Sequence, residues 1–397
     1  MDPSARKIFN DNFTPEKYQH LLEALNKGLK NPIAFRVAET PVFLTDNFRD
    51  KLLAAGEDII KVILQPDFKQ LTERAIPEKW NVANENGHPH FIALDFGVCK
   101  DENGQIVPKL IELQGFPSLY SFQVHLGDSY RKTFDIPDDW SIYFNHLNKE
   151  SYINLLRETI VGPNKVDEVV LMDVNAPEQK TAVDFYLTQY YLGIPVVSLS
   201  DLIEQNGKLF YESRGSFKPV KRIYNRLIFD EIEGDPDIFN KVVDIRKSFD
   251  VEWITHPNWF YRISKFTMPF LNGEYVPKTM FLNELHTIPD GLENYVLKPL
   301  FSFAGQGVII DVTREDVERI KDPENWILQE KVNYEPVLQA PDDGVKIEIR
   351  LLYLWPDGDS KPTLAINLAR LSRGKMIGVR YNKDFDWVGG TVAFMRK

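Results

Sequence analysis

The chain has 397 residues, of which 43% are hydrophobic and 26% charged, so it is long enough for two or three packed domains, and a wholly disordered chain is excluded. Its 58 acidic residues outnumber 47 basic ones and give a formal net charge of -11, which argues against nucleic acid as a partner. Any site for a polyanion must therefore gather a few Lys and Arg residues locally.

Cysteine usage favours a reducing compartment, and the hydropathy of the chain argues against a membrane protein. Cys99 is the only cysteine, so the chain cannot form an internal disulfide or a four-cysteine zinc site. No stretch approaches the roughly 18 continuous apolar residues of a membrane span, and the N-terminus lacks the pattern of a secretory signal. We therefore expect a soluble, cytoplasmic protein with no membrane partner.

The first part of the chain, residues 1–85, is expected to be helical. Thr14 and Pro15 form an N-cap followed by proline at the first helical position, and the apolar residues that follow fall on one face. Apolar residues at 52–63 suggest a second helix.

A β-hairpin is expected next, within residues 86–130. The runs FIALDFGVCK and IVPKLIELQ are strand-like, and Asn103-Gly104 between them is a strong signal for a two-residue turn. With that turn, Asp95 faces Glu112 on the opposite strand. Pro108, within the second strand, raises the alternative of a bulge that shifts this register.

The hairpin brings oxygen-bearing side chains together. Gln114 shares the face of Glu112 because side chains alternate along a strand, so Asp95, Glu112 and Gln114 form one cluster. Two opposed carboxylates repel each other unless a cation lies between them, and Mg²⁺ prefers oxygen ligands. The cluster is therefore either a magnesium site or a solvated edge whose carboxylates find lysine partners.

A Rossmann-like α/β domain is expected at residues 160–245. The strand-like runs VDEVVLMD and IPVVSL flank a helix that opens near Pro177 and ends at Gly193. The runs KLFYES and VKRIYNRLIF continue this domain, and a polar stretch near 230–250 marks its boundary. Residues 250–397 then alternate strand-like runs with short helical pieces, which predicts a mixed α/β fold in several lobes.

Lys298 and the loop after it suit a phosphate group. The strand YVLKPL is followed by SFAGQG, with Ser302, Gly305 and Gly307, and then by the strand-like run GVIID. A lysine beside a loop whose backbone approaches closely is what a triphosphate needs, although the Walker spacing is missing and a plain hairpin loop is the alternative. Three isolated basic residues, each more typical of a surface ion pair when taken alone, are Arg226, Lys265 and Arg350.

In this order, the pieces resemble the ATP-grasp superfamily in its circularly permuted form, as in eukaryotic-type glutathione synthetases and glutathionylspermidine synthases. The resemblance covers residues 90–397 and implies an ATP-grasp nucleotide domain at 250–397. It implies that Lys265 in ISK and Lys298 in YVLKP contact the phosphates under the loop SFAGQG. In WILQEKV it implies an adenosine-binding segment, namely Gln329, Glu330, Lys331 and Val332.

The same resemblance implies the metal site and the substrate domain. The metal motif comes first in permuted members, and here it matches Asp95 with Glu112-Leu-Gln114, where Gln114 replaces the usual Asn. Relatives carry an acidic metal ligand near the position of Ser302, which this chain lacks. Arg226, in a VYxR-like strand, and Arg350 are the candidates to stabilise the acyl-phosphate oxyanion.

The resemblance implies an ATP- and Mg²⁺-dependent ligase that joins a small-molecule carboxylate to an amine through an acyl phosphate. The departures at Gln114 and Ser302 leave open a nucleotide-binding module without catalysis. A third hypothesis is a ligase that modifies a peptide or protein, because the helical residues 1–85 have no role in a small-molecule site.

Overall fold

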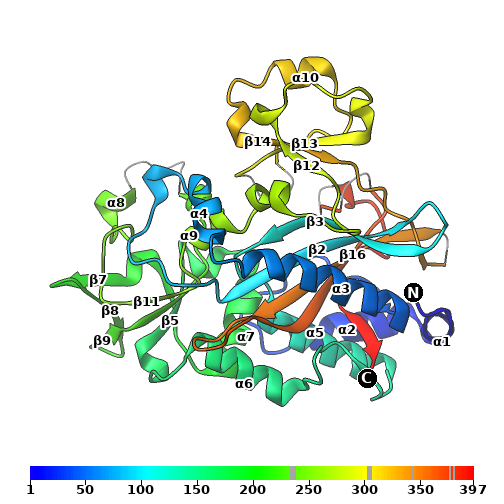
Figure 1. The fold of residues 1–397 in the computed structure, drawn as a ribbon. Coiled ribbons are helices and arrows are strands. Elements are labelled where there is room, and N and C mark those ends of the chain that lie inside the picture. Colours follow the sequence, from blue (N-terminus) through cyan, green and yellow to red (C-terminus); the bar gives the residue numbers. More distant parts are fainter. Residues whose placement is uncertain (233–237, 302–305, 342, 375–376, 379–380) are drawn as a thin grey trace.

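A long antiparallel sheet forms the centre of the molecule (Figure 1). Its order is β18-β17-β16-β2-β3, and β15 pairs with β16 beside this path. The strands span Phe91–Lys100 (β2), Ile106–Gln114 (β3), Leu338–Gln339 (β15), Gly344–Leu354 (β16), Thr363–Ser372 (β17) and Gly389–Thr391 (β18). The computed structural model describes residues 1–232, 238–301, 306–341, 343–374, 377–378 and 381–397.

The hairpin and the C-terminal third of the chain meet in this sheet. β16 pairs with β2 on one side and with β17 on the other, so two segments more than 200 residues apart in sequence are neighbours. Most residues of these strands are buried, which agrees with their nearly continuous apolar runs. The few charged side chains in them are therefore forced into contact with one another.

Helices from the N-terminal part cover the sheet. α3, Asp46–Ile63, packs against β3, and at Gly56 an added Cβ would lie 3.3 Å from Leu351 of β16. α1 (Pro3–Asn12) and α2 (Pro15–Asn26) both open on proline after a side-chain N-cap, as the sequence predicts for α2. α5, Tyr120–Phe134, packs against α2 and β17.

The C-terminal strand meets an early part of the chain in a small sheet, and the backbone N–H of Asp2 donates to Phe43 of this sheet. The C-terminal strand β19, Ala393–Arg396, lies between β1 (Val42–Phe43) and β4 (Trp140–Ser141). β1 pairs with it in parallel and β4 in antiparallel orientation. The N-terminal residues are therefore built into the main body.

A second, parallel sheet has the order β11-β10-β5-β6. Its strands are β5 (Val169–Asp173), β6 (Val196–Ser198), β10 (Arg222–Asn225) and β11 (Glu252–Ile254), and its helices include α6 (Lys149–Ile160) and α7 (Ala182–Leu192). Gly193, with a φ of +79°, ends α7 as predicted. A separate antiparallel sheet, seen beside α8 in Figure 1, consists of β7 (Leu202–Gln205), β8 (Lys208–Ser213) and β9 (Ser216–Val220).

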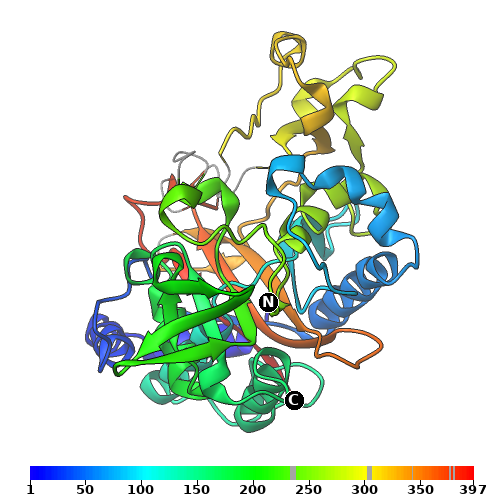
Figure 2. The same ribbon diagram turned by 90° about the vertical axis from the view of Figure 1, so that its left-hand side faces the viewer.

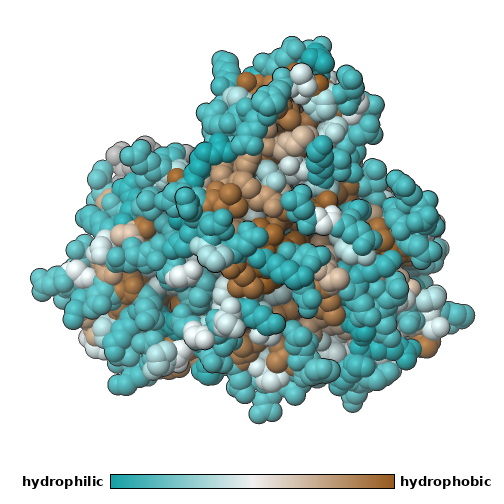
Figure 3. All heavy atoms as spheres, in the orientation of Figure 1, coloured by the Kyte–Doolittle hydropathy of each residue, from teal (hydrophilic) through white to brown (hydrophobic). Residues whose placement is uncertain are grey.

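A small lobe projects from the body, as Figures 1 and 2 show. It contains the sheet β12-β14-β13, formed by Thr279–Phe281, Trp326–Glu330 and Tyr295–Pro299, and helix α10, Arg314–Glu318. One face of this sheet has its own apolar core, namely Leu282, Leu297, Val312, Val317 and Leu328. Ile327 and Phe281, on the other face, belong to the core of the body, and hydrophobic atoms gather at the base of the lobe in Figure 3.

The remaining short helices are α4 (Phe68–Leu71), α8 (Ile238–Lys241) and α9 (Asn258–Arg262). The expected mixed α/β fold in several lobes is confirmed. The prediction of a strand at GVIID is wrong, because within residues 307–311 only Ile309 forms a bridge, to Leu297. No helix in the described parts of the chain is both long and apolar enough to cross a membrane.

Candidate functional site

The hairpin pairs Asp95 with Glu112, as the sequence predicts, but its loop is longer than the predicted one and one strand contains a bulge. Residues 101–105 join the strands, so the expected two-residue turn is wrong. Asp101 stabilises this longer loop, because its side chain accepts hydrogen bonds from the backbone N–H groups of Asn103 and Gln105. A bulge between Asp95 and Phe96 then offsets the change in register, whereas Pro108 pairs regularly with Val98.

Asp95 is held by two arginines. Arg350 of β16 donates from Nε and Nη2 to the two carboxylate oxygens at 2.5 and 2.6 Å, and Arg370 of β17 donates to Oδ2 at 2.8 Å. Asp95 is 1% exposed, so this contact is a buried, bidentate ion pair. Its oxygens are therefore occupied by guanidinium groups.

Glu348 extends the cluster. Its carboxylate contacts Arg370 on one side and accepts a hydrogen bond of 3.0 Å from the hydroxyl of Tyr334 on the other. The ring of Tyr334 packs on Gly97, where an added Cβ would lie only 2.8 Å from it. Burial raises the pKa of Glu348, Arg370 opposes the rise, and Asp95 adds to it.

Two lysines from the last third of the chain approach Glu112. Lys298 of β13 donates to the backbone oxygen of Ile111 at 3.1 Å, and burial lowers its pKa to about 8. Burial raises the pKa of Glu112, but Lys265, Arg350 and Lys298 together hold it below its usual value. The structure therefore brings together Glu112, Lys265 and Lys298, which the sequence predicts for one site.

The cluster carries more positive than negative charge. Three carboxylates, from Asp95, Glu112 and Glu348, face four basic side chains, from Lys265, Lys298, Arg350 and Arg370. Such a surplus in a largely buried place favours an anion with several charges, such as a phosphate chain. In an acidic protein this is the local gathering of basic residues that a polyanion requires.

The fit to Mg²⁺ depends on an accompanying anion. Within the described residues no group of three or more His, Cys, Asp or Glu side chains could hold a metal ion. Gln114 donates from Nε2 to Oε1 of Glu112 at 2.9 Å, which leaves Gln114 Oε1 and Glu112 Oε2 outside that bond as oxygen donors. These two residues fit Mg²⁺ that also binds phosphate oxygens, whereas Asp95 is paired with arginine.

The residues of the predicted adenosine segment lie in different surroundings. Gln329 pairs with Val296 in the lobe sheet, so it shares a face with Lys298 and looks away from the lobe's own core. Its side chain is 1% exposed, and its Nε2 has no hydrogen-bond partner in the described parts of the chain. Lys331 instead donates to the backbone oxygen of Glu293 at 2.8 Å. A buried amide without a partner is what a ligand with an acceptor would satisfy.

The remaining residues predicted to bind the nucleotide lie at the surface, in a turn or outside the described residues. Glu330 is exposed and accepts a hydrogen bond from the backbone N–H of Lys278, and Val332 lies two residues beyond the end of β14. Gly307 has a φ of +74° beside Pro299. Ser302 and Gly305 lie outside the described residues.

Arg226 lies elsewhere, at the end of β10. Its guanidinium donates to Asp184 at 2.9 Å and lies over the rings of Phe116 and Phe185, with centroid distances of 5.6 and 4.8 Å. Asp184 also accepts three backbone hydrogen bonds at the start of α5. Arg226 is therefore packed in a buried ion pair, and its contacts are separate from the cluster around Asp95.

The parallel sheet has a topological switch point, which is where such sheets bind ligands. Its strand order reverses between β5 and β10, and ligands of such sheets bind outside the carboxyl ends of the strands at that point. Asp173 ends β5, and its pKa is raised by burial. Gln179 donates to Asp173 and Glu231 at 2.8 Å each and also lines a pocket of about 180 Å³ next to residues 31–34.

Sequence reasoning missed Arg370, Tyr334, Asp173 and Asp184. Arg370 had a visible signal, because it is the charged residue within the apolar run TLAINLARL. Tyr334 carried none, since its role depends on packing against a strand more than 200 residues earlier.

No family model and no curated protein matches the sequence. Among solved structures, the chain is similar to a glutathione synthetase-like effector (GSS30) from Globodera pallida in its apo form, with a TM-score of 0.60 over 97% of this chain and 98% of that one. The fold is glutathione synthetase-like. At 12% sequence identity the similarity concerns the fold alone.

Proposed function

We propose that this protein is an ATP-dependent ligase of the circularly permuted ATP-grasp type, which joins a small-molecule carboxylate to an amine. The observation that supports this most is the meeting of Lys265 and Lys298 with Glu112 at the end of the hairpin. The oxygen donors lie on the hairpin and the lysines more than 150 residues later in the sequence. The glutathione synthetase-like fold agrees with this proposal.

The proposed reaction needs no nucleophile from the protein. An oxygen of the substrate carboxylate attacks the γ-phosphorus of ATP, the bond to the β-phosphate oxygen breaks, and ADP leaves. The amine then attacks the acyl carbon, and phosphate leaves as the amide forms. The protein contributes position and charge, with Lys265 and Lys298 on the phosphates and Gln329 on the base.

Mg²⁺ would be held by Glu112 and Gln114 together with phosphate oxygens, and when bound it would neutralise charge on the transferred group. Arg350 was predicted to contact the acyl phosphate, but its Nε and Nη2 are engaged by Asp95. The side chain of Arg370 is 35% exposed and is better placed to meet a ligand. Substrate would lie at the carboxyl ends of β5 and β10, near Arg226 and Asp173.

Calorimetric titration of ATP tests the nucleotide site. Wild type should bind ATP with Mg²⁺ present, and Lys298→Met should bind it at least tenfold more weakly, since a charge-assisted contact is lost. Wild type should then release ADP with a pool of acids and amines, and Glu112→Ala should not. No ATP binding by wild type would overturn the proposal.

A second candidate is a nucleotide-binding module without catalysis. It is favoured by the two arginines on Asp95 and by Gln114, since both reduce the oxygen donors for a metal. It predicts ATP binding by wild type without ADP release for any acid and amine tested. ADP release that Glu112→Ala abolishes would exclude it.

A further inference from the structure

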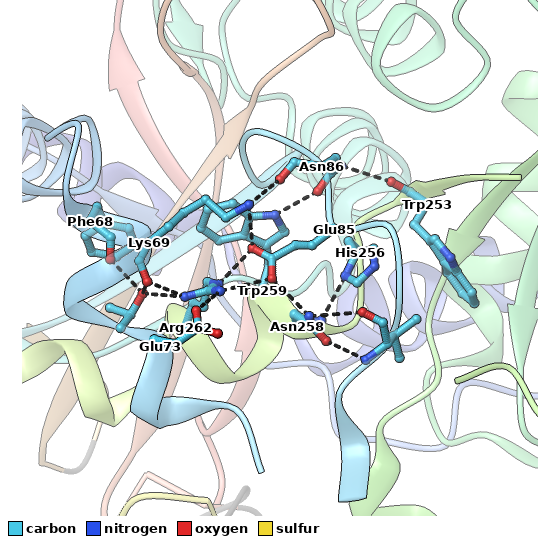
Figure 4. A network of polar contacts seen from close by, with 12 residues as sticks. Phe68, Lys69, Glu73, Glu85, Asn86, Trp253, His256, Asn258, Trp259 and Arg262 are labelled. Atoms are coloured by element: carbon cyan, nitrogen blue, oxygen red, sulfur yellow. Dashed lines mark hydrogen bonds and ion pairs between the residues drawn. The ribbon is translucent and has the colours of Figure 1, made fainter. Parts of the chain in front are cut away.

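A segment of the N-terminal part, residues 68–86, lies directly against α9 and is here named the brace. Apart from turns, it contains α4 and two short 3₁₀ segments, Glu73–Ala75 and Glu78–Trp80, and no strand. Such a segment has few internal hydrogen bonds, so its place is set by what it contacts. Figure 4 shows these contacts, which converge on α9.

Arg262, the last residue of α9, is the centre of the network. Its Nε and Nη2 donate to the two carboxylate oxygens of Glu85 at 2.8 and 3.1 Å, and Nη1 donates to the backbone oxygen of Lys69 at 2.5 Å. The Arg262 side chain is 3% exposed and that of Glu85 is 11% exposed. Burial raises the pKa of Glu85, but hydrogen bonds from Arg262, Asn258 and Lys69 hold it below its usual value.

The other residues of α9 join the same segment. Asn258 donates to Glu85 at 2.9 Å and to the backbone oxygen of Val82 at 3.2 Å, and it accepts from the backbone N–H of Val82 at 3.0 Å. Trp259 donates from its indole to Asn86 at 2.8 Å. Three of the five residues of α9 thus have side chains bonded to the brace (Figure 4).

On its other side, α9 contacts the end of β3. The backbone N–H of Gly115, one residue after Gln114, donates to the backbone oxygen of Ile263 at 2.7 Å. An added Cβ at Gly115 would lie 2.4 Å from the backbone oxygen of Trp259, so the two backbones approach as closely as glycine allows. The short turn after α9 is therefore held between the brace and the hairpin.

Lys265 follows this turn, three residues after Arg262. It is 7% exposed and opens the 3₁₀ helix Lys265–Phe270, which packs against β3. Its charge lowers the pKa of Glu112. Its position over the hairpin thus depends on where α9 lies. A displacement of about 1 Å in such a group is enough to cost large factors in binding or rate.

We propose that Glu85 and Arg262 are positioning residues, through which the brace sets the place of Lys265 at the phosphate-binding cluster. This rests on the proposed ATP site. Without the Glu85 carboxylate, the buried Arg262 guanidinium keeps its bonds to Lys69 and Thr72, but its remaining charged partner is Glu73, whose side chain is 67% exposed. The end of α9 then shifts toward water, and Lys265 moves with it. This gives residues 68–86 a role in the phosphate-binding cluster that acts through α9.

A double-mutant cycle tests the proposal in the full-length protein. Glu85→Gln keeps the shape of the side chain and removes its charge, and it should weaken ATP binding about tenfold. Adenosine carries no phosphate, so its affinity should stay within about twofold. In a Lys265→Met background, Glu85→Gln should weaken ATP binding no further. Asp46→Asn, which removes a carboxylate paired with Arg49 in α3, is the control and should leave both affinities unchanged.

The possible results separate a failure of the positioning role from a failure of the proposed function. Equal losses of ATP affinity by Glu85→Gln with and without Lys265, or an equal loss of adenosine affinity, would show a general structural effect and overturn the positioning role. Wild type that binds neither ATP nor adenosine would overturn the proposed function and the positioning role together. Hydrogen exchange in residues 258–270 adds a check that needs no ligand. If exchange there is unchanged in Glu85→Gln, this result alone overturns the proposed shift of α9.

Discussion

At the scale of single residues, the acidic groups in the central cluster have different sets of partners, although Arg370 contacts both Asp95 and Glu348. Asp95 is paired with arginines, Glu348 with Arg370 and Tyr334, and Glu112 is surrounded by lysines. A buried ion pair contributes little net stability, because desolvation offsets the attraction, but loss of one partner is costly. The partners therefore decide which carboxylates stay charged and which oxygens remain for a ligand.

Lys298 predicts a dependence of ATP binding on pH. Its pKa is about 8 in the free protein, because burial disfavours the charged form, and a bound phosphate would raise that pKa. Below pH 8 the lysine is already protonated. Above pH 8 binding must take up a proton, so ATP affinity should fall by up to about tenfold per pH unit. Calorimetry between pH 7 and 9.5 measures this, and Lys298→Arg, which stays charged, should show a much flatter profile.

Asp95→Asn should destabilise the protein by about 3 kcal/mol, because it leaves the buried Arg350 guanidinium without its charge partner. Urea unfolding followed by circular dichroism measures the loss. The control is Asp386→Asn, which removes an ion pair to Arg36 whose aspartate is 81% exposed, and it should cost less than about 0.5 kcal/mol. Equal shifts of the two urea midpoints would contradict the assignment of Asp95 as a buried anchor.

At the scale of elements, the site is built where strand and helix ends converge. β3 supplies Glu112 and Gln114, β13 supplies Lys298, and the 3₁₀ helix Lys265–Phe270 that follows α9 supplies Lys265. Gly115 sets the approach of β3 to α9, since its missing side chain leaves room for the backbone of Trp259. The geometry of the cluster is thus a property of these contacts rather than of any one element.

Gly115→Ala should lower stability by about 1–3 kcal/mol and weaken ATP binding, because the added methyl group pushes α9 away from β3. Thermal unfolding and ATP titration are the measurements. Gly87→Ala is the matched control, since an added Cβ there meets nothing within 4 Å. An ATP affinity unchanged in Gly115→Ala would show that the contact between β3 and α9 does not set the site.

At the scale of the whole molecule, the cluster gathers residues from four distant parts of the chain. Its surplus of positive charge stands within a protein whose formal net charge is -11. Long-range attraction of anions by the protein as a whole is therefore weak, and the local cluster must provide specificity. The small lobe, with its own apolar core, brings Lys298 and Gln329 to the body on one face of its sheet.

The same charge balance predicts the order in which ligands bind. Mg²⁺ alone should not bind measurably at 1 mM or so, because its oxygen donors lie among four basic side chains, whereas it should bind once ATP is present. Calorimetric titration of Mg²⁺ with and without ATP separates the two cases. Tight binding of Mg²⁺ to the nucleotide-free protein would contradict the charge balance described above.

The sequence by itself determined the features that depend on local periodicity. Alternation along β3 placed Glu112 and Gln114 on one face, and the apolar run marked Lys298 near the end of its strand. The predicted pairing of Asp95 with Glu112 rested on a two-residue turn that is absent, and it holds because the bulge compensates for the longer loop. The N-cap and proline of α2 and the glycine that ends α7 were also legible, since each depends on the backbone of a few neighbouring residues.

Only the tertiary structure decided which charges meet. Arg350 and Arg370 are 255 and 275 residues from Asp95 in sequence, and they reach it because β16 lies between β2 and β17. The length of the hairpin loop and the compensating bulge also followed from packing across the sheet. Local patterns specify which face a side chain takes, whereas strand order and helix contacts specify its partners. The availability of Asp95 to a metal, and the link from the brace to Lys265, therefore required the folded chain.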